Sequence, residues 1–556
     1  MREKILKHAL HNAIKYKGKA HLGAVIGRVL SENPNLKKNA KKITHEIKKI
    51  VEEVNSWKHD KQKEEFEKYK DHAEKKGKEE KDPFSIFNIG QYDKVITAFP
   101  PEPSKYPHIG HAKAAFLNYE LAKRHNGKFI LRFEDTNPKL AEKEFYKIHL
   151  DNYEWLGLKP DTITYASDNM EKFYELAKKM IKKGHAYVCT LSQEELSKHR
   201  MQGTEPEERY LTEDKHLERF EEMLSAKKSS MVLLLKGFMQ HKNSAMRDPT
   251  LMRVMDHKHA RLGKKFHLWP TYDLENAAMD GLEGITHRLR TKEFELRNEL
   301  QSHIQAALGF RQTRIYEFAR FNMEGVESSG RTIRELIQKK KLIGWDDPSL
   351  TTIVALRRRG FTPEAIKNFV LATGITKAES TLSWDDLFVH NKRILDSQAN
   401  RYFFIHDAKE IKIENAPEQT VKLKLHPEFA ERGTREFKTK DSFYIEKEDF
   451  KKLKERKDNR LMDCLNFRKT KKRIVFDSVE HSHFKKNPGI IIHWLPKSKD
   501  LAKVEIMMPD KKIAKGLAEQ GVKELEVGAV IQFARFGFCR LDKKEKGKLQ
   551  FWYTHK

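Results

Sequence analysis

The feature that most constrains this chain is a strand, a helix and a second strand that follow one another between residues 94 and 133. KVITAF is an apolar run typical of a strand, residues 111–124 have helical spacing, and FILRF follows the turn Asn126-Gly127. Two strands connected through a helix pair in parallel, so this stretch predicts the start of an α/β sheet. The turn AFPPEPSKYPHIGH therefore lies at the carboxyl end of a parallel strand, where doubly wound sheets bind their ligands.

That turn carries His108 and His111 on either side of Ile-Gly, just before the helix. A helix N-terminus favours a phosphate, Gly110 would let the phosphate approach the backbone, and two imidazoles could donate hydrogen bonds to charge that develops on it. The pattern thus predicts an ATP site. A pair of surface or capping histidines remains the alternative, because short motifs often match by chance.

The rest of the chain changes character several times, which predicts a multidomain protein. Apolar residues recur at helical spacing from Ile43 to Val54, and residues 58–81 are almost wholly charged. Short strands dominate after residue 397, and FHLWPTYDL and VIQFARFGF each have the apolar character of a strand. We expect an N-terminal helical appendage (1–90), an α/β Rossmann-like catalytic domain in two halves (91–190 and 266–335) split by an insertion (191–265), a helical connecting domain (336–396) and all-β barrels (397–556).

Charge and cysteine usage indicate the class of partner and the compartment. The net charge of +28, from 109 Lys+Arg against 81 Asp+Glu, points to a polyanion such as nucleic acid, although a lysine-rich proteome would also produce it. The three cysteines are too widely spaced for a disulfide framework or a C-x-x-C metal site, which favours a reducing cytoplasm. We see no signal peptide and no apolar run long enough to span a membrane.

Four motifs, taken together, show a resemblance to a known protein family. ITAFPPEPSKYPHIGHAKAA, GKFILRFEDTNP, WPTYDLENAAMDGLEGITHRLRTKEFE and RFNMEG together resemble class I aminoacyl-tRNA synthetases of the glutamate and glutamine group. The N-terminal stretch KYKGKAHLGAVIG is similar to the appended helices of the archaeal-type glutamyl enzymes. The resemblance covers the chain from about Gly18 to its end. It implies ATP-dependent ligation of an amino acid to tRNA, through an aminoacyl-adenylate and with Mg²⁺.

The resemblance also implies residue roles. His108, His111 and Arg331 would be catalytic, by binding ATP phosphate and stabilising the transition state of adenylation. Glu134, in RFEDTNP, would hold the α-ammonium of the amino acid. The further ATP-binding residues would be Gly110, Thr291, Ser329 and Gly330, and the further amino-acid-binding residues would be Glu102, Tyr272, Asn276 and Arg290. No metal ligand is expected from the protein.

Arg290 favours glutamate over glutamine as the substrate. A buried glutamate side chain needs a fixed cation, and a guanidinium can hold it through two hydrogen bonds, whereas an amide would leave that cation without a counter-charge. Glutaminyl enzymes tend to carry a small uncharged residue at this position. The alternative is an arginine that is paired with a local acid such as Glu293.

Two positions depart from the family pattern. Ala98 stands where the family usually has the arginine of T-R-F-P, a residue at the substrate pocket. Gly330 stands where the second signature loop usually has the lysine of S-K-R, since the loop here reads VESSGRTI. We therefore expect Arg331 and the loop backbone to contact more of the pyrophosphate.

The same resemblance implies the partners. The insertion resembles the domain that binds the acceptor end of tRNA, and the C-terminal region resembles the two anticodon-reading β-barrels. Within it, we expect at least two of Tyr402, Phe403 and Phe404 to be barrel core. The implied partners are tRNA-Glu and glutamate, with a monomeric chain. Charging of tRNA-Gln, a glutaminyl-tRNA synthetase and a catalytically weak tRNA-binding relative remain as alternatives.

Overall fold

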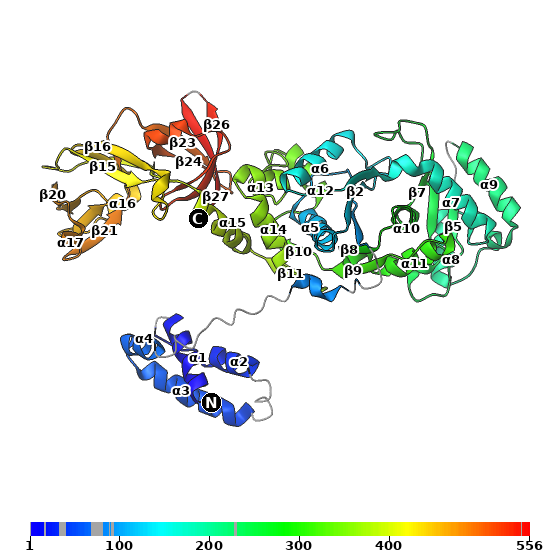
Figure 1. The fold of residues 1–556 in the computed structure, drawn as a ribbon, viewed down its shortest axis with the longest axis horizontal. Coiled ribbons are helices and arrows are strands. Elements are labelled where there is room, and N and C mark those ends of the chain that lie inside the picture. The colour runs from blue at the N-terminus through cyan, green and yellow to red at the C-terminus, as the bar shows by residue number, and fades with distance from the viewer. Residues whose placement is uncertain are drawn as a thin grey trace. The chain divides into compact units, whose positions relative to one another are not determined.

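The computed structural model divides into two compact units, Met1–Ser85 and Ile86–Lys556 (Figure 1). The structure describes residues 2–15, 18–32, 40–67, 82–87, 89, 94–226, 231–545 and 547–556.

The first unit is helical. Ile47, Ile50, Val51 and Val54 lie on one face of the third helix and are buried against the other helices, as their spacing predicts. The charged stretch after residue 58 is not wholly solvated, because its first part forms a helix in which the buried Gln62 side chain donates to the backbone of Val54. Residues 68–81 of that stretch lie outside the described residues. The helices are α1 (Arg2–Lys15), α2 (Leu22–Glu32), α3 (Ala40–Ser56) and α4 (His59–Glu67).

The second unit is built on a parallel sheet with the strand order β3-β2-β1-β8-β9, which confirms the α/β prediction. Phe99 and Phe129 face one side of this sheet and pack against α5, while Ala98 and Ile130 face the other side. The strands are β1 (Ile96–Phe99), β2 (Lys128–Phe133), β3 (Thr162–Tyr165), β8 (His287–Thr291) and β9 (Arg314–Phe318). The helices of this domain are α5 (Ile109–Arg124), α6 (Lys143–Trp155), α7 (Met170–Lys182), α10 (Tyr272–Leu282) and α11 (Leu296–Leu308).

A four-stranded antiparallel sheet interrupts the parallel one in the sequence. The stretch FHLWPTYDL, expected as one strand, is a strand only as far as Pro270 and begins a helix at Tyr272. Leu274, Ala277 and Ala278 explain the change, because they recur at helical spacing and are buried in the core cluster of this region. The elements are β4 (Ala186–Cys189), α8 (Gln193–Gln202), α9 (Glu213–Ser225), β5 (Val232–Leu235), β6 (Thr250–Val254) and β7 (Leu268–Pro270).

A mainly helical stretch follows the parallel sheet. Ile353, Leu356, Ile366 and Phe369 from this stretch are buried in the same cluster as α5, so the stretch packs on the α5 side of the sheet. Its elements are β10 (Phe321–Met323), α12 (Gly330–Gln338), α13 (Ile353–Arg359), α14 (Pro363–Ala372), β11 (Ser380–Leu382) and α15 (Trp384–Gln398).

The C-terminal region is predominantly β, which confirms the expected fold class. Tyr402, Phe403 and Phe404 are all buried. The region has two hydrophobic core clusters. Phe403 packs in one of them, and Tyr402 and Phe404 pack in the other, because successive strand residues point to opposite faces. VIQFARFGF is not one strand, since the chain turns at Arg535 with a positive φ of 64°.

Those clusters belong to a seven-stranded sheet, in the order β12-β25-β26-β27-β23-β24-β13, and to the smaller sheets beside it. The elements are β12 (Arg401–Tyr402), β13 (Phe404–His406), β14 (Ala408–Lys412), β15 (Gln419–Lys424), β16 (Thr434–Thr439), β17 (Ser442–Glu446), α16 (Lys447–Lys452), β18 (Asp458–Leu461), β19 (Asn466–Lys469), β20 (Ile474–Ser478), α17 (His481–Phe484), β21 (Pro488–Ile492), β22 (Leu495–Pro496), β23 (Ala502–Met507), β24 (Ile513–Ala518), β25 (Val530–Phe533), β26 (Gly537–Glu545) and β27 (Lys548–His555).

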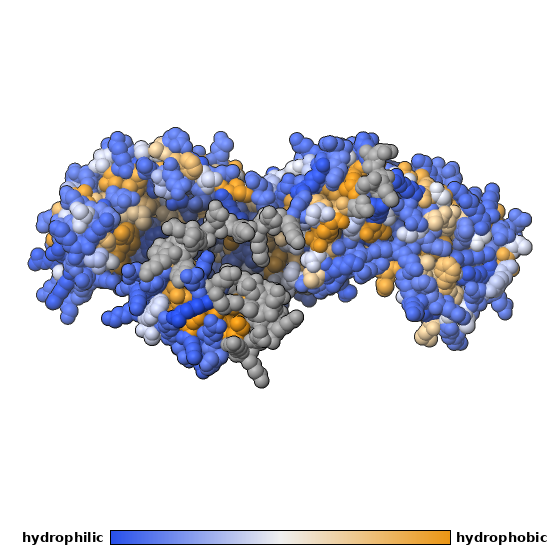
Figure 2. Space-filling view, turned by 60° about the horizontal axis from the view of Figure 1, so that its bottom comes forward, coloured by the Kyte–Doolittle hydropathy of each residue, from blue (hydrophilic) through white to orange (hydrophobic). Residues whose placement is uncertain are grey.

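Hydrophilic residues dominate the face shown in Figure 2, as the 34% of charged residues in the chain would suggest. Among the described residues, no helix combines the length and the apolar character that crossing a bilayer requires.

Candidate active site

A cavity of about 540 Å³ lies at the carboxyl end of the parallel sheet. Its walls come from the turn before α5, the end of β2, the start of α10, the end of β8 and the loop before α12. This is the crevice where a doubly wound sheet binds its ligand. The residues from the predicted set that line it are His108, Gly110, His111, Glu134, Tyr272, Arg290, Thr291, Ser329 and Gly330.

His108 is the N-cap residue of α5, His111 lies in the first turn of that helix, and both line the cavity. Nδ1 of His108 accepts a hydrogen bond from the backbone N–H of Gly110 (3.1 Å), and Nδ1 of His111 accepts from the backbone N–H of His108 (3.2 Å). A neutral imidazole with an accepting Nδ1 carries its proton on Nε2. The capping alternative is therefore real but compatible with function, since capping leaves each ring one N–H donor.

Both rings are neutral at physiological pH. Burial, with the charge of Lys105 as the next cause, lowers the pKa of His108 to about 3. Burial also lowers the pKa of His111 well below its usual value, and the neighbouring His108 adds to the effect. The pair can thus donate hydrogen bonds but is not a source of positive charge.

The backbone N–H groups at the start of α5 already have partners. Besides the two that the imidazoles accept, the N–H of Ile109 donates to the carbonyl of Thr351 (3.0 Å), and that of His111 donates to the carbonyl of His108 (2.9 Å). A Cβ on Gly110 would lie 2.9 Å from Cε1 of His108, so the glycine makes room for the ring. An anion here would therefore be held by side chains and the helix dipole, not by free helix-end N–H groups as the sequence suggested.

Glu134 follows β2 and is held by two buried arginines. Nη2 of Arg288 lies 3.2 Å from its Oε1, and Nη2 of Arg132 lies 3.9 Å from the same oxygen. Both arginines also contact Oδ1 of Asp280 on α10, Arg132 at 2.8 Å. Burial raises the pKa of Glu134, while Arg288 and Arg132 act in the opposite direction. The arginines thus favour the carboxylate form, which an ammonium ligand requires.

Arg290 is a buried cation without an acidic partner. Its guanidinium donates to Oδ1 of Asn298 and to the hydroxyl of Tyr272 (3.3 Å). No carboxylate among the described residues lies within 4.0 Å of it, and Glu293 is paired with Arg320 instead. The proposed local ion pair is therefore not found. A guanidinium in this state suits a ligand carboxylate.

Three predicted residues are not brought to the cavity. Glu102 is exposed and accepts a hydrogen bond from the Ser104 hydroxyl (2.7 Å). Asn276 is buried behind the wall, where its amide donates to Oε1 of Gln301 (2.6 Å). Arg331 points to solvent with 90% of its side chain exposed, 3.2 Å from Glu335. The neighbouring Ser329 and Gly330 do line the cavity, as the N-cap and first residue of α12.

Two charged residues of the cavity wall, Arg288 and Lys105, were not predicted from the sequence. Arg288 and Arg290 alternate in the strand HRLRT, and this spacing places both on one face of β8. Lys105 is a lone basic residue in the turn that leads to His108, and it also lines the cavity. A charged residue repeated at period two in a buried strand, or set beside a predicted phosphate site, is the signal that would have found them.

Comparisons with known proteins agree with this geometry. The family model described as tRNA synthetases class I (E and Q), catalytic domain, matches residues 94–397. Models described as anti-codon binding domains of the same group match residues 399–484 and 491–542.

Relatives match along the whole chain. It is 40% identical to a glutamate–tRNA ligase of Pyrococcus furiosus, over 99% of this chain and 99% of the relative. It is 40% identical to that of Pyrococcus horikoshii over 100% of both chains, and 38% identical to that of Methanocaldococcus jannaschii over 100% of both.

Proposed function

Because the chain belongs to the class I tRNA synthetases of the glutamate and glutamine group, we propose that it joins L-glutamate to tRNA at the expense of ATP. The observation that carries the choice of glutamate is Arg290, whose buried guanidinium has hydrogen-bond partners but no carboxylate partner among the residues that the structure describes. The side-chain carboxylate of glutamate would neutralise it. Glutamine would leave the charge uncompensated in a buried site.

The two ends of the amino acid would be recognised separately. Glu134 would accept the α-ammonium group, with Oε1 already fixed by Arg288. Arg290 would bind the side-chain carboxylate, and the Tyr272 hydroxyl, which accepts from Arg290, would help to orient that guanidinium. All three residues line the same cavity, so one ligand can reach both charges.

Adenylation would then need little covalent help from the protein. An α-carboxylate oxygen of glutamate attacks the α-phosphorus of ATP, the bond from that phosphorus to the bridging oxygen breaks, and pyrophosphate leaves with the electron pair. The Nε2–H groups of His108 and His111 are the donors for charge that grows on the phosphate oxygens. Thr291, Ser329 and Gly330 would line the rest of the nucleotide site.

Mg²⁺ would accompany ATP and neutralise part of the phosphate charge. Of the described residues that line the main cavity, Glu134 is the only carboxylate, and it is paired with Arg288. Because Mg²⁺ is usually held by substrate phosphates and a few carboxylates, the residues here fit a metal that is carried mainly on ATP.

The RNA would be held outside this cavity. We propose that the insertion (191–265) binds the acceptor end and that the barrels from residue 397 onwards read the anticodon, with the net charge of +28 attracting the phosphates. The antiparallel sheet of β4 to β7 and the C-terminal sheets are the structural frame for these two tasks.

The test is ATP–pyrophosphate exchange with purified chain, in the presence and absence of tRNA-Glu. We expect exchange that depends on glutamate, with little activity on glutamine. The family resemblance implies that the amino acid is activated only with tRNA bound, so the tRNA should be included. A second arm with tRNA-Gln would show whether that RNA is charged as well. Glutamine-dependent exchange that exceeds the glutamate rate would favour a glutaminyl enzyme.

A further inference from the structure

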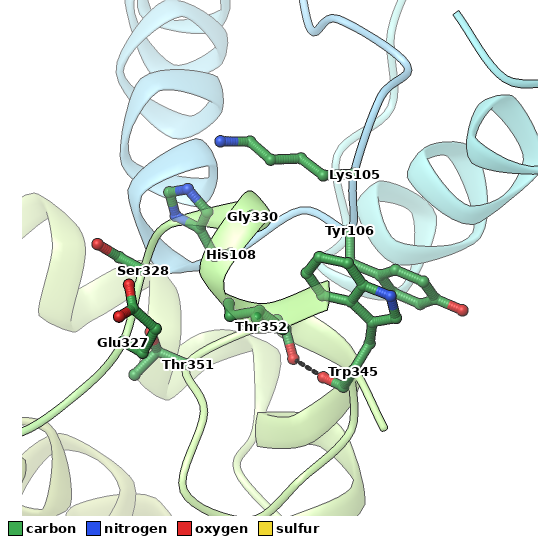
Figure 3. A pocket seen from close by; sticks show the side chains of 10 residues that line it. Lys105, Tyr106, His108, Glu327, Ser328, Gly330, Trp345, Thr351 and Thr352 are labelled. Carbon is green, nitrogen blue, oxygen red and sulfur yellow. Dashed lines mark hydrogen bonds between the residues drawn. The ribbon is translucent and has the colours of Figure 1, made fainter. Parts of the chain in front are cut away.

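The side chain of Lys105 lies directly over Gly330. A Cβ built on Gly330 would lie 3.0 Å from Cδ, 3.6 Å from Cβ and 3.9 Å from Cγ of Lys105. In Figure 3 the Lys105 chain passes above Gly330, with its ammonium nitrogen on the side of His108. The φ angle of Gly330 is not in the positive range, so the glycine is needed for this close approach and not for a special backbone conformation.

The Lys105 ammonium has no hydrogen-bond or ion-pair partner among the described residues, although the residue is partly buried. The other lysine and arginine side chains that line the main cavity all have partners. Lys113 donates to the carbonyl of Ala319, Arg320 is paired with Glu293, and Arg288 and Arg290 are bonded as described above. In the described part of the chain, Lys105 is therefore the cation of the cavity wall that has no partner.

The surroundings of Lys105 favour an anion. It lines the cavity together with His108 and with Ser329 and Gly330, so the N-termini of both α5 and α12 border the same space. Burial and the charge of Arg320 lower the pKa of Lys105, which means that a bound anion would be stabilising there. The backbone donors of α5 are already used, so a phosphate must be held by side chains.

We propose that Lys105 is the phosphate-binding lysine of this chain, and that it replaces the lysine which the signature loop lacks at Gly330. This rests on the proposed function. As the α-phosphorus accepts the glutamate oxygen and loses the bridging oxygen, pyrophosphate gains negative charge, and the Lys105 ammonium stabilises it. A lysine is suited to this role as a point charge on a flexible stem.

Other basic residues are placed less well. Arg331 points to solvent beside Glu335, and Lys339, Lys340 and Lys341 are exposed and do not line the cavity. The expectation that Arg331 contacts pyrophosphate therefore has no support in this arrangement.

The test compares Lys105→Gln with Lys147→Gln, an exposed lysine on α6 that lines neither the cavity nor the smaller recess beside it. We expect Lys105→Gln to lower kcat/KM for ATP in tRNA-dependent pyrophosphate exchange by about 100-fold, the size of effect seen when a transition-state donor is removed. KM for glutamate and the Kd for tRNA should change by less than about threefold, as should all parameters of Lys147→Gln. Circular dichroism spectra and thermal midpoints check folding.

An exchange of the two residues sharpens the test. Gly330→Lys alone should be neutral or harmful, because its side chain meets Lys105. In Lys105→Gly, the added Gly330→Lys should recover at least about tenfold, since the cation returns from the other side of the contact. The proposal is overturned if Lys105→Gln stays within threefold of the wild type, or if the exchanged pair is no better than Lys105→Gly. Wild-type protein that fails to charge tRNA with glutamate would instead refute the proposed function.

A separate observation concerns Ala98. Thr97 on β1 is in register with His287 on β8, so the next pair, Ala98 and Arg288, lies side by side on one face of the sheet. Arg132 from β2 and Arg288 from β8 both reach Oδ1 of Asp280 on this face, which the small and fully buried Ala98 leaves open. A long side chain at position 98 would compete for this space.

We infer that Arg288 is a positioning residue for Glu134, supplying from β8 the guanidinium that position 98 on β1 no longer supplies. It holds Oε1 of Glu134 at 3.2 Å and so fixes the carboxylate for the substrate ammonium. Arg288→Ala should raise KM for glutamate by at least about tenfold, while KM for ATP stays within about threefold.

Ala98→Arg in the Arg288→Ala background should recover part of that loss, whereas Ala98→Arg alone should lower the thermal midpoint, because the site is already filled. A purely structural arginine would change stability without the selective shift in KM for glutamate. If that shift is absent, or if Ala98→Arg does not restore it, the inference is wrong.

Discussion

Replacing Arg290 by glutamine isolates the charge that we assign to glutamate recognition. The amide is long enough to keep a hydrogen bond to Asn298 or Tyr272, so the main change is loss of the cation. In the complex this leaves a substrate carboxylate without its buried partner, which costs about 2–5 kcal/mol. At 1.36 kcal/mol for each factor of ten, kcat/KM for glutamate should fall by about 30-fold to about 5,000-fold.

The free protein should respond differently. Arg290 has no carboxylate partner among the described residues, so its burial costs free energy that the variant recovers. We expect the free energy of unfolding to change by less than about 1 kcal/mol, or to rise. The matched comparison is Arg132→Gln, in which Asp280 and Glu283 lose a fully buried partner and several kcal/mol of stability should be lost.

The assay is steady-state charging of tRNA-Glu over a range of glutamate concentrations, with urea denaturation of both variants alongside. A large kinetic loss with little change in unfolding supports the assignment. Unchanged glutamate kinetics, or a stability loss as large as that of Arg132→Gln, would show that Arg290 is structural.

Four further predictions concern the two histidines and the binding of tRNA. His111→Ala should slow single-turnover adenylate formation by about 100-fold and leave tRNA affinity unchanged, because its ring is a donor to transition-state charge; equal loss of tRNA binding would indicate misfolding. Since burial holds the pKa of His108 near 3, the rate of adenylation should show no acid limb near pH 6.5, and a limb there would contradict the neutral pair. The same depressed pKa means that this group's contribution to stability is present above about pH 6.5 and is lost as the pH falls towards 3, which denaturation at several pH values can follow. Finally, log Kd for tRNA should rise steeply with log salt concentration, and a flat response would undo the interpretation of the +28 charge.

The spacing of apolar residues and the order of the expected strands and helices predicted the main features of the fold. The strand–helix–strand start, the helical spacing of Ile47 to Val54 and the burial of Tyr402 to Phe404 all follow from local patterns that tertiary packing reinforces. FHLWPTYDL was misjudged because an apolar run of mixed character suits either a strand or a helix, and the packing of Leu274 and Ala277 decides between them.

The site was harder to predict in its details. The spacing of His108 and His111 predicted that both lie at a helix start. It did not predict that their rings would accept hydrogen bonds from the backbone N–H groups there. The interplay of Lys105 with Gly330, and of Arg288 with Ala98, joins positions that are far apart in the sequence. The sequence shows that Gly330 and Ala98 depart from the usual pattern, but it does not show which residue compensates for each. Only the fold shows which side chain occupies the space beside each of them.

Competition between the two amino acids tests the central claim most directly. Purified chain, ATP and tRNA-Glu are incubated with equal concentrations of glutamate and glutamine, and the esterified amino acid is identified by mass spectrometry. We predict that glutamate is found almost exclusively, because only its carboxylate neutralises Arg290. Predominant glutaminyl-tRNA, or no esterified product with intact tRNA, would contradict the account.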